Sequence, residues 1–358
     1  MKIAILGLPM AGKKTLFGLL TARDVLGPKR AGEVISGKAN VWDKRVDDIS
    51  KIAKPAKITY AQTDFVLCSD IDNSGGGGGQ LANSWIQEAK TSDLLCIVVR
   101  GFTSEEVYHP AGSVNANRDK ENLEAELIFA DLDLVEKRLD RIDKDKKKVK
   151  TTAIQNLEEE TILKFKKTLE SNEKLNTLTL SAEEEASINS LNFLTIKPII
   201  WCYNVDEDKL REQQQQPQQT TKSHDDVFIV SAQIEKEILA IDNLEERTEY
   251  LKDLNISSLG SDRLNIAAYD LLGLMSFYTM GKDEVRAWTI RKGTSAPKAA
   301  GKIHSDIERG FIRVEVIKYN DLMFCGNEQK IRTLGKFMVK GQDYIIEDGD
   351  ICNFLFNV

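Results

Sequence analysis

A glycine-rich stretch close to the amino end contains residue types that bind phosphate groups. The segment GLPMAGKKT, residues 7–15, matches G-x-x-x-x-G-K, the pattern of a phosphate-binding loop. In such a loop the backbone N–H groups surround the phosphates, and the lysine contacts their oxygens. The pattern therefore predicts a phosphate site made by Met10, Ala11, Gly12, Lys13, Lys14 and Thr15.

The residue after the loop lysine departs from this pattern. It is normally Ser or Thr, whose hydroxyl binds the Mg²⁺ that bridges the phosphates, but this chain has Lys14 there. An ammonium group can hold a phosphate, but it cannot coordinate a metal ion. We therefore expect nucleotide binding to survive at this loop better than Mg²⁺-dependent catalysis.

Two polar segments later in the chain could contact the base of a nucleotide. Asn204 to Glu207 (NVDE) follow the apolar run KPIIWCY, and Val230 to Gln233 (VSAQ) follow DVFI. A side-chain amide, a carboxylate and a backbone N–H group can together bind the edge of a purine. With the loop, they would place phosphates and base at opposite ends of one crevice. The predicted base-binding residues are Asn204, Val205, Glu207, Ser231, Ala232 and Gln233.

Short apolar runs must form the elements that position these residues. Runs of this length, separated by helical patterns, predict an α/β fold with a mostly parallel sheet. Sites in such sheets lie at the carboxyl ends of the strands, where both groups of candidate residues are found. The predicted strands are residues 2–6, 63–68, 94–102, 197–205 and 226–232, and a helix is predicted at 15–22.

A long insertion separates the third and fourth predicted strands. Its apolar residues recur at helical spacing in two stretches, which predicts two amphipathic helices paired as an antiparallel coiled-coil hairpin. The run DKDKKKVK, residues 143–150, joins them and is basic, which suits either a solvated tip or a contact with nucleic acid or ribosome. The two stripes are Leu123, Leu127, Ala130, Leu134, Val135 and Leu139, then Ile154, Leu157, Ile162, Phe165 and Leu169.

The pattern changes again from about Asp283, where short alternating strands are punctuated by Gly and Pro. The first half of this β-rich module is basic, with eight Lys or Arg between Arg286 and Lys318 against three acids. The predicted organisation is a nucleotide-binding domain (1–117 and 196–282), a helical insertion (118–195) and a C-terminal module (283–358). Two low-complexity stretches, 75–79 and 213–219, are expected to be flexible loops.

Composition narrows the class of protein. The net charge of −7 argues against a protein that coats nucleic acid, but it leaves room for local basic patches. The five cysteines are far apart with no C-x-x-C pair, which favours reduced thiols over a disulfide framework or a zinc site. No apolar run approaches the roughly 18 residues that a membrane helix requires. We therefore expect a cytoplasmic protein that makes no membrane contact.

Several segments together resemble the YchF or Obg-like ATPase family, within the translation-factor class of P-loop GTPases. They are GLPMAGKKTLFGLLT, NVDE, ELIFADLDLVEKRLDRI and EVRAWTIRKGTSAPKAAGKIHSDIERGFIRVEVI, and the resemblance covers nearly the whole chain. It implies a P-loop GTPase-like sheet, an inserted coiled-coil hairpin and a C-terminal β-grasp-like TGS module. It also implies hydrolysis of ATP or GTP and binding to ribosome or RNA through the basic hairpin tip and the TGS module.

The chain departs from the family pattern on the metal side of the site. Besides Lys14, an alignment without gaps puts Leu67 at the family's metal-contacting aspartate and Asp70 at its γ-phosphate-sensing glycine. Ala31 falls at the threonine of the first switch. A different register makes DIDN, residues 70–73, the equivalent motif and restores an acid. We therefore predict purine-nucleotide binding with weak or lost hydrolysis and without a metal site built from side chains.

His109 matches the family histidine that is a candidate for positioning water, so the resemblance implies a catalytic role for it. Two alternatives remain open. The chain could be an active ATPase or GTPase that uses Lys14, Asp70 or Asp72 in place of the usual metal ligands. It could also be a ribosome- or RNA-binding protein whose nucleotide site is vestigial.

Overall fold

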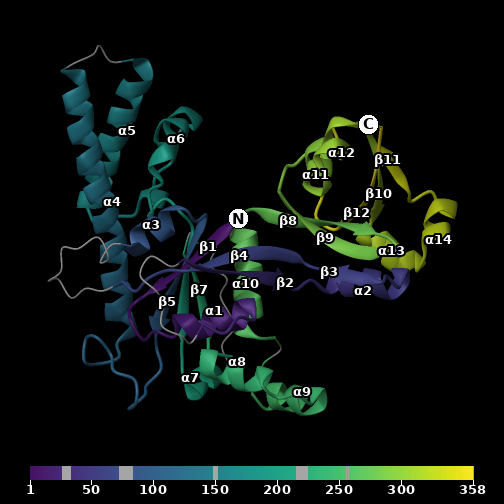
Figure 1. The fold of residues 1–358 in the computed structure, drawn as a ribbon, viewed down its shortest axis with the longest axis horizontal. Coiled ribbons are helices and arrows are strands. Elements are labelled where there is room, and N and C mark those ends of the chain that lie inside the picture. Colours follow the sequence, from purple (N-terminus) through teal and green to yellow (C-terminus); the bar gives the residue numbers. More distant parts are fainter. Residues whose placement is uncertain are drawn as a thin grey trace. The chain divides into compact units, whose positions relative to one another are not determined.

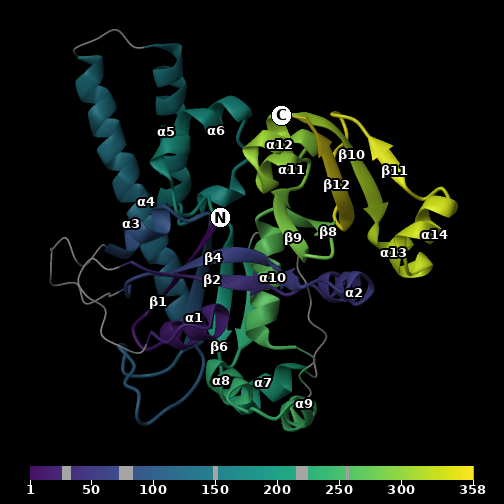
Figure 2. The ribbon, with the colours of Figure 1, turned by 45° about the vertical axis from the view of Figure 1, so that its right-hand side comes forward.

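The computed structural model describes residues 1–25, 34–71, 84–147, 152–214, 225–254, 256 and 258–357 (Figures 1 and 2). The described residues cluster into two compact units. The first unit comprises Met1–Gly37 and Asp64–Ser261, and the second comprises Lys38–Thr63 and Asp262–Val358. Each unit has its own core of buried apolar side chains.

A mostly parallel sheet organises the first unit. In the described part of the chain it has six strands in the order β2-β4-β1-β5-β6-β7, and β1 and β4–β7 pair in parallel. The fold class and all five predicted strands are confirmed. Strand β2 is not predicted from the sequence, because its residues, ISGKANV, include few apolar ones. The strands are β1 (Lys2–Gly7), β2 (Ile35–Val41), β4 (Ala61–Leu67), β5 (Leu94–Arg100), β6 (Ile199–Asn204) and β7 (Asp225–Val230).

Strands β1 and β5 pair directly, and their composition explains their central position. Every residue of β5 is buried, and in β1 Lys2 alone is exposed. Parallel strands that are covered on both faces must be apolar along their length, because neither face meets water. Since neighbouring strands run in the same direction, the carboxyl ends of β1, β5, β6 and β7 lie along one edge of the sheet.

Helices follow the strands of the first unit, as expected for an α/β fold. Helix α1 directly follows the loop after β1 and buries Leu16 and Phe17 against the sheet, which confirms the predicted strand–loop–helix.

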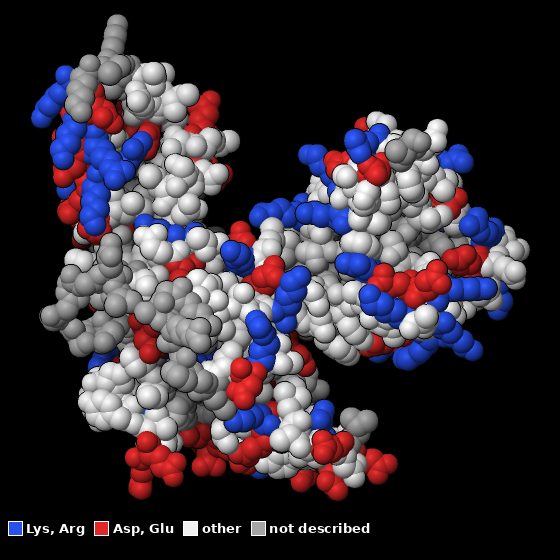
Figure 3. Space-filling view, viewed as in Figure 1, with Lys and Arg blue, Asp and Glu red and all other residues white. Residues whose placement is uncertain are grey.

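Figure 3 shows acidic side chains gathered at the end of this unit that carries α7, α8 and α9. The helices are α1 (Lys13–Thr21), α3 (Ser84–Lys90), α7 (Glu207–Gln214), α8 (Ala232–Leu239) and α9 (Leu244–Asp253).

Two long helices form the predicted hairpin and lie side by side in both views (Figures 1 and 2). Helix α4 (Ala116–Lys146) begins at the cap Asn115, and α5 (Ala153–Glu170) begins with a capping box made by Thr152 and Gln155. Shorter elements complete the insertion: η1 (Leu175–Thr177), α6 (Ala182–Ile188) and η2 (Asn189–Leu191). The hairpin core contains Ile128, Val135, Ile142, Ile162, Phe165, Leu169 and Phe193.

The predicted stripes are partly corrected by the structure. Leu123, Leu127 and Ala130 pack into the core of the sheet instead of the hairpin, because the amino-terminal half of α4 lies against that core. Ile154 is 72% exposed, so its predicted place in the stripe is wrong. It lies in the first turn of α5, beside the hairpin bend, and residues 148–151 of that bend lie outside the described residues.

A buried carboxylate fastens the hairpin to the chain that leads into β6. Asp131 of α4 accepts hydrogen bonds from the Leu194 N–H (2.9 Å), the Thr195 N–H (2.7 Å) and the Thr195 hydroxyl (2.7 Å). Burial raises the pKa of Asp131, and these hydrogen bonds oppose the rise. The contacts orient the hairpin within the first unit.

The second unit is built on a mixed sheet that combines the short strand at residues 57–59 with strands from the last third of the chain. Among the described residues its order is β11-β10-β12-β8-β9-β3, and β3 pairs in parallel with β9. The strands are β3 (Lys57–Thr59), β8 (Leu274–Met280), β9 (Glu284–Arg291), β10 (Phe311–Lys318), β11 (Met338–Lys340) and β12 (Asp350–Phe356). The helices are α2 (Lys44–Ala53), α10 (Gly260–Leu271), α11 (Ala296–Ile303), α12 (Ser305–Arg309), α13 (Tyr319–Cys325) and α14 (Glu328–Thr333).

The C-terminal strands of this sheet begin at Leu274, before residue 283 where the predicted C-terminal module begins. The sheet also contains residues 57–59, which lie outside that predicted module. The division into three functional parts stays a prediction. All five cysteines lie in the described part of the chain, are buried, and form no disulfide there. Of the helices formed by described residues, none has the length and apolar character needed to cross a bilayer.

Candidate functional site

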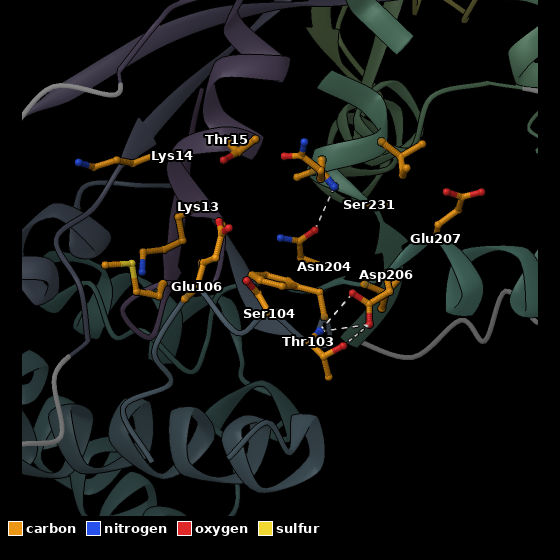
Figure 4. A pocket seen from close by; sticks show the side chains of 18 of the residues that line it. Lys13, Lys14, Thr15, Thr103, Ser104, Glu106, Asn204, Asp206, Glu207 and Ser231 are labelled. Carbon is orange, nitrogen blue, oxygen red and sulfur yellow. Dashed lines mark hydrogen bonds between the residues drawn. The ribbon is translucent and has the colours of Figure 1, made fainter. Parts of the chain in front are cut away.

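A pocket of about 740 Å³ opens at the carboxyl ends of the central strands (Figure 4). Its walls come from the predicted phosphate-binding loop after β1 (residues 7–15), Asp70 after β4, and residues between Phe102 and Val107 after β5. Residues 204–207 after β6 and 231–234 after β7 complete it. All these segments belong to the first unit. The pocket therefore lies where open α/β sheets bind their ligands.

The two glycines of the loop pattern are required by close approaches of the backbone. Gly7 has φ of 145°, and a Cβ there would lie 2.4 Å from the carbonyl oxygen of Val98. Gly12 has φ of 92°, and a Cβ there would lie 2.2 Å from Nδ2 of Asn204. Gly12 also caps α1, so the positive end of that helix faces the pocket. This geometry suits an anion.

Lys13 is held inside the loop by three acceptors. Its side chain is 5% exposed, and Nζ donates hydrogen bonds to the carbonyl oxygens of Gly7 (2.8 Å) and Leu8. The third partner is Asp70, whose Oδ1 lies 2.6 Å from Nζ. Burial lowers the pKa of Lys13, and the Asp70 carboxylate opposes that effect. Asp70 therefore stabilises the protonated, charged form of Lys13.

The positions that would hold Mg²⁺ in the family pattern offer few ligands. Lys14 is exposed and extends away from Asn204 in Figure 4. Leu67 is buried and has no side-chain oxygen, and Asp70 is engaged with Lys13. No three or more His, Cys, Asp or Glu side chains of the described residues form a group that could hold a metal ion. These residues do not fit a protein-held Mg²⁺; Ala31 and Asp72 lie outside the described part.

Five of the six predicted phosphate-binding residues line the pocket: Met10, Gly12, Lys13, Lys14 and Thr15. The sixth, Ala11, is a buried residue of the same loop and does not line the pocket. All six predicted base-binding residues line the pocket: Asn204, Val205, Glu207, Ser231, Ala232 and Gln233. The structure thus brings the two predicted groups together, and their individual roles toward a nucleotide stay predictions.

Asn204 links the two ends of the pocket. It is 5% exposed, its Nδ2 donates to the carbonyl oxygen of Ala11 (3.1 Å), and its Oδ1 accepts from the Ala232 N–H (3.0 Å). An Asn amide has two N–H donors, so this geometry leaves one of them for a ligand. Glu207 begins α7 and pairs with Arg211 at 2.6 Å.

His109 is not among the residues that line the pocket. It is 6% exposed, and its Nε2 lies 2.9 Å from Oδ2 of Asp119 in the first turn of α4. Its Nδ1 accepts a hydrogen bond from the Ala111 N–H (3.1 Å), so the proton is assigned to Nε2, which donates to Asp119. Through its hydrogen bond to Asp119, His109 connects the loop after β5 to helix α4.

The sequence reasoning missed the pocket wall that follows β5. Phe102 lies under the guanidinium of Arg100, 4.4 Å from ring centroid to Cζ. Thr103 donates from its N–H to both carboxylate oxygens of Asp206, at 3.1 Å each. This segment follows a predicted strand, which is a signal for a site, but the predicted strand runs to residue 102 whereas β5 ends at Arg100. The missed lining residues are Phe102, Thr103, Ser104, Glu106, Val107, Asp206 and Ile234.

Comparisons with known proteins agree with the resemblance read from the sequence. The YchF-GTPase_C family model, described as "Protein of unknown function (DUF933)", matches residues 274–357. The "Ribosome-binding ATPase YchF" of Bacillus subtilis (strain 168) is 34% identical over 363 residues, covering 99% of this chain and 98% of that protein. The protein of the same name from Escherichia coli O157:H7 is 37% identical over 363 residues, covering 100% and 99%.

A solved structure extends the likeness to three dimensions. The Schizosaccharomyces pombe YchF GTPase superposes with a TM-score of 0.82 at 30% identity, covering 99% of this chain and 97% of that one. The similarity in sequence and in structure thus runs over the full length of this chain. On these grounds the chain belongs to the YchF family.

Proposed function

We propose that this chain binds a purine nucleotide, ATP or GTP, in the pocket of the first unit, and that it associates with the ribosome. The observation that carries the proposal is the position of Lys13 in a loop shaped by Gly7 and Gly12, beside the end of α1. A buried lysine and a helix N-terminus directed at one pocket are the groups that bind polyphosphates. The names of the relatives from B. subtilis and E. coli support the same function.

The opposite end of the pocket suits the base. Asn204 would donate its remaining N–H to a ring nitrogen, and Glu207 would accept from an exocyclic amino group. Phe102 supplies an apolar ring to the wall. The volume of about 740 Å³ lies within the range of small-molecule sites, roughly 300–1,000 Å³.

We further propose that hydrolysis is weak. Phosphoryl transfer in such loops depends on positioning and on neutralising charge at the phosphate oxygens. Lys14 replaces a metal-binding hydroxyl, Leu67 has no oxygen, and Asp70 is paired with Lys13. To neutralise the phosphate oxygens the chain offers Lys13 and the amino end of α1. These groups can bind phosphate, but they supply less positive charge than a metal site would. The catalytic role of His109 is part of this proposal and comes from the family resemblance alone.

The proposed partner surface is basic. We assign ribosome or RNA contact to the hairpin bend, whose described part contains Lys144, Lys146 and Lys147, and to the basic first half of the C-terminal module. We retain the predicted three-part division and a cytoplasmic location as part of this proposal.

Calorimetric titration of the full chain with ATP, ADP and GTP tests nucleotide binding. Lys13→Ala should weaken binding by roughly 1.5–3 kcal/mol, or about 10- to 150-fold, because a charge-assisted contact is lost. Lys236→Ala, on the exposed side of α8, is the matched control and should bind as the parent does. Equal affinity of the parent and Lys13→Ala would remove the loop from the proposal. Ribosome association without any nucleotide binding would favour a vestigial site.

Single-turnover hydrolysis at saturating Mg²⁺, with and without chelator, tests the catalytic part. The parent should turn over slowly beside the E. coli relative, and Lys14→Ser should recover little. Rates comparable with the relative, abolished by chelator, would contradict weak hydrolysis. That result would favour the alternative of an active enzyme whose metal site includes Asp70.

A further inference from the structure

Asp70 occupies the position beside the loop lysine that a terminal phosphate would need. An ammonium group has three donors, and within the described residues Lys13 directs them to Gly7, Leu8 and Asp70. Asp70 is the charged member of this set. Its side chain is 55% exposed and lines the pocket, so it is reachable from the ligand side.

A nucleotide must compete with this carboxylate for Lys13. In phosphate loops the backbone N–H groups surround the α- and β-phosphates, while the lysine reaches the β- and γ-phosphates. The third phosphate therefore extends beyond the backbone cradle toward the lysine, and here toward its partner Asp70. A diphosphate can use the cradle and the end of α1 without placing a further anionic group beside that carboxylate.

The charge of the whole pocket adds to this effect. Among the described residues that line it, Asp70, Glu106, Asp206 and Glu207 are acidic, whereas Lys13 and Lys14 are basic. This excess of negative charge disfavours a ligand more strongly as the ligand's own negative charge increases. A triphosphate carries more negative charge than a diphosphate with the same base.

We propose that Asp70 makes this pocket selective for a purine nucleoside diphosphate over the corresponding triphosphate. The inference rests on the proposed function, because it concerns the same site and specifies its ligand. Asp70 acts by holding Lys13 and by repelling the terminal phosphate. In the alignment without gaps the family pattern has an uncharged glycine at this position, and a glycine would do neither.

Calorimetric titration of the full chain with ADP and with ATP, in chelator, tests this. The parent should bind ADP at least about tenfold more tightly than ATP, which corresponds to about 1.4 kcal/mol. Asp70→Asn keeps the shape and removes the charge, so it should tighten ATP binding and bring the two affinities within about threefold. Asp70→Ser should behave in the same way. Asp208→Asn removes an exposed charge of α7 that does not line the pocket, and should keep the parent ratio.

The possible outcomes separate this inference from the proposed function. An ADP-to-ATP ratio that is the same in the parent and both Asp70 variants would overturn the selectivity while leaving nucleotide binding intact. The ATP titration is repeated in Mg²⁺. Weaker ATP binding by Asp70→Asn than by the parent under these conditions would also overturn the selectivity, because Asp70 would then act as a metal ligand. Absence of binding for both nucleotides in every variant would overturn the proposed function and this inference with it.

Discussion

The side chain of Asn204 donates a hydrogen bond to the backbone carbonyl of Ala11 over 3.1 Å, and so ties the end of β6 to the phosphate loop. Its oxygen accepts from the Ala232 N–H at the start of α8. One buried amide therefore connects the two ends of the pocket, although the residues it joins are far apart in the chain. The shape of the loop depends on this amide as well as on the glycines.

Asn204→Ala should destabilise the first unit and weaken nucleotide binding. It leaves the buried carbonyl of Ala11 and the N–H of Ala232 without this partner, at roughly 1–3 kcal/mol for each group. Urea denaturation gives the loss of stability, and calorimetry gives the loss of affinity. Asn122→Ala, on the exposed face of α4, is the control. A variant at 204 that is as stable as the parent would show that the loop does not need the amide.

His109→Ala should lower stability by roughly 1–3 kcal/mol, because it removes a hydrogen-bond donor from the buried carboxylate of Asp119. His109→Gln can supply a side-chain N–H in its place and should recover part of that loss. Thermal unfolding of both variants measures this. Single-turnover hydrolysis by the Gln variant then tests the catalytic role predicted from the resemblance. Parent-like turnover by a folded Gln variant would argue against that role.

Asp43 should make the second unit sensitive to acid. Burial raises the pKa of Asp43, but hydrogen bonds from Arg45 and Tyr278 outweigh it, so the pKa lies below its usual 3.8. A carboxylate with a lowered pKa contributes stability that is fully present above the unfolded-state value and is lost as pH falls through the folded-state value. At neutral pH, Asp43→Asn should cost roughly 1.5–3 kcal/mol through the lost charge-assisted bonds.

The check is the difference in unfolding free energy between the parent and Asp43→Asn as a function of pH. It should be constant at neutral pH and shrink as pH falls below 3.8. Asp283→Asn, an exposed carboxylate of the same unit, should show no such trend. A difference independent of pH would mean that the charge of Asp43 contributes nothing.

Reversing charge at the hairpin bend should weaken ribosome association in a salt-dependent way. Lys144 and Lys147 are exposed there, and Figure 3 shows Lys and Arg along the hairpin. Binding through phosphates releases counterions, so the double variant Lys144→Glu/Lys147→Glu should reduce the slope of log K against log salt by about 1.4–1.8. Sedimentation with ribosomes over a salt series measures it.

The matched control reverses Lys166 and Lys167, near the other end of α5. If both double variants bind as the parent does, or if association is independent of salt, the bend is an ordinary solvated helix end. Equal loss by both variants would point to overall charge instead of a specific contact at the bend.

The sequence alone determined the fold class and the main walls of the pocket. GLPMAGKKT and the apolar strands are local patterns, and parallel strands bring their carboxyl ends to one edge, which is why the segments at Lys13 and Asn204 could be predicted to meet. Two amphipathic stripes likewise indicated the hairpin, because helical spacing can be read without knowledge of long-range contacts.

The tertiary structure alone decided which charged and polar groups meet. The Lys13–Asp70 pair, the burial of His109 against Asp119, and the pairing of β3 with β9 leave no periodic signal in the chain. A single carboxylate has no repeating pattern that indicates its partner, and a three-residue strand is too short to show alternation. Such contacts arise when the packed sheet and helices bring distant backbone segments together, and buried groups then pair with whatever polar partner lies within reach.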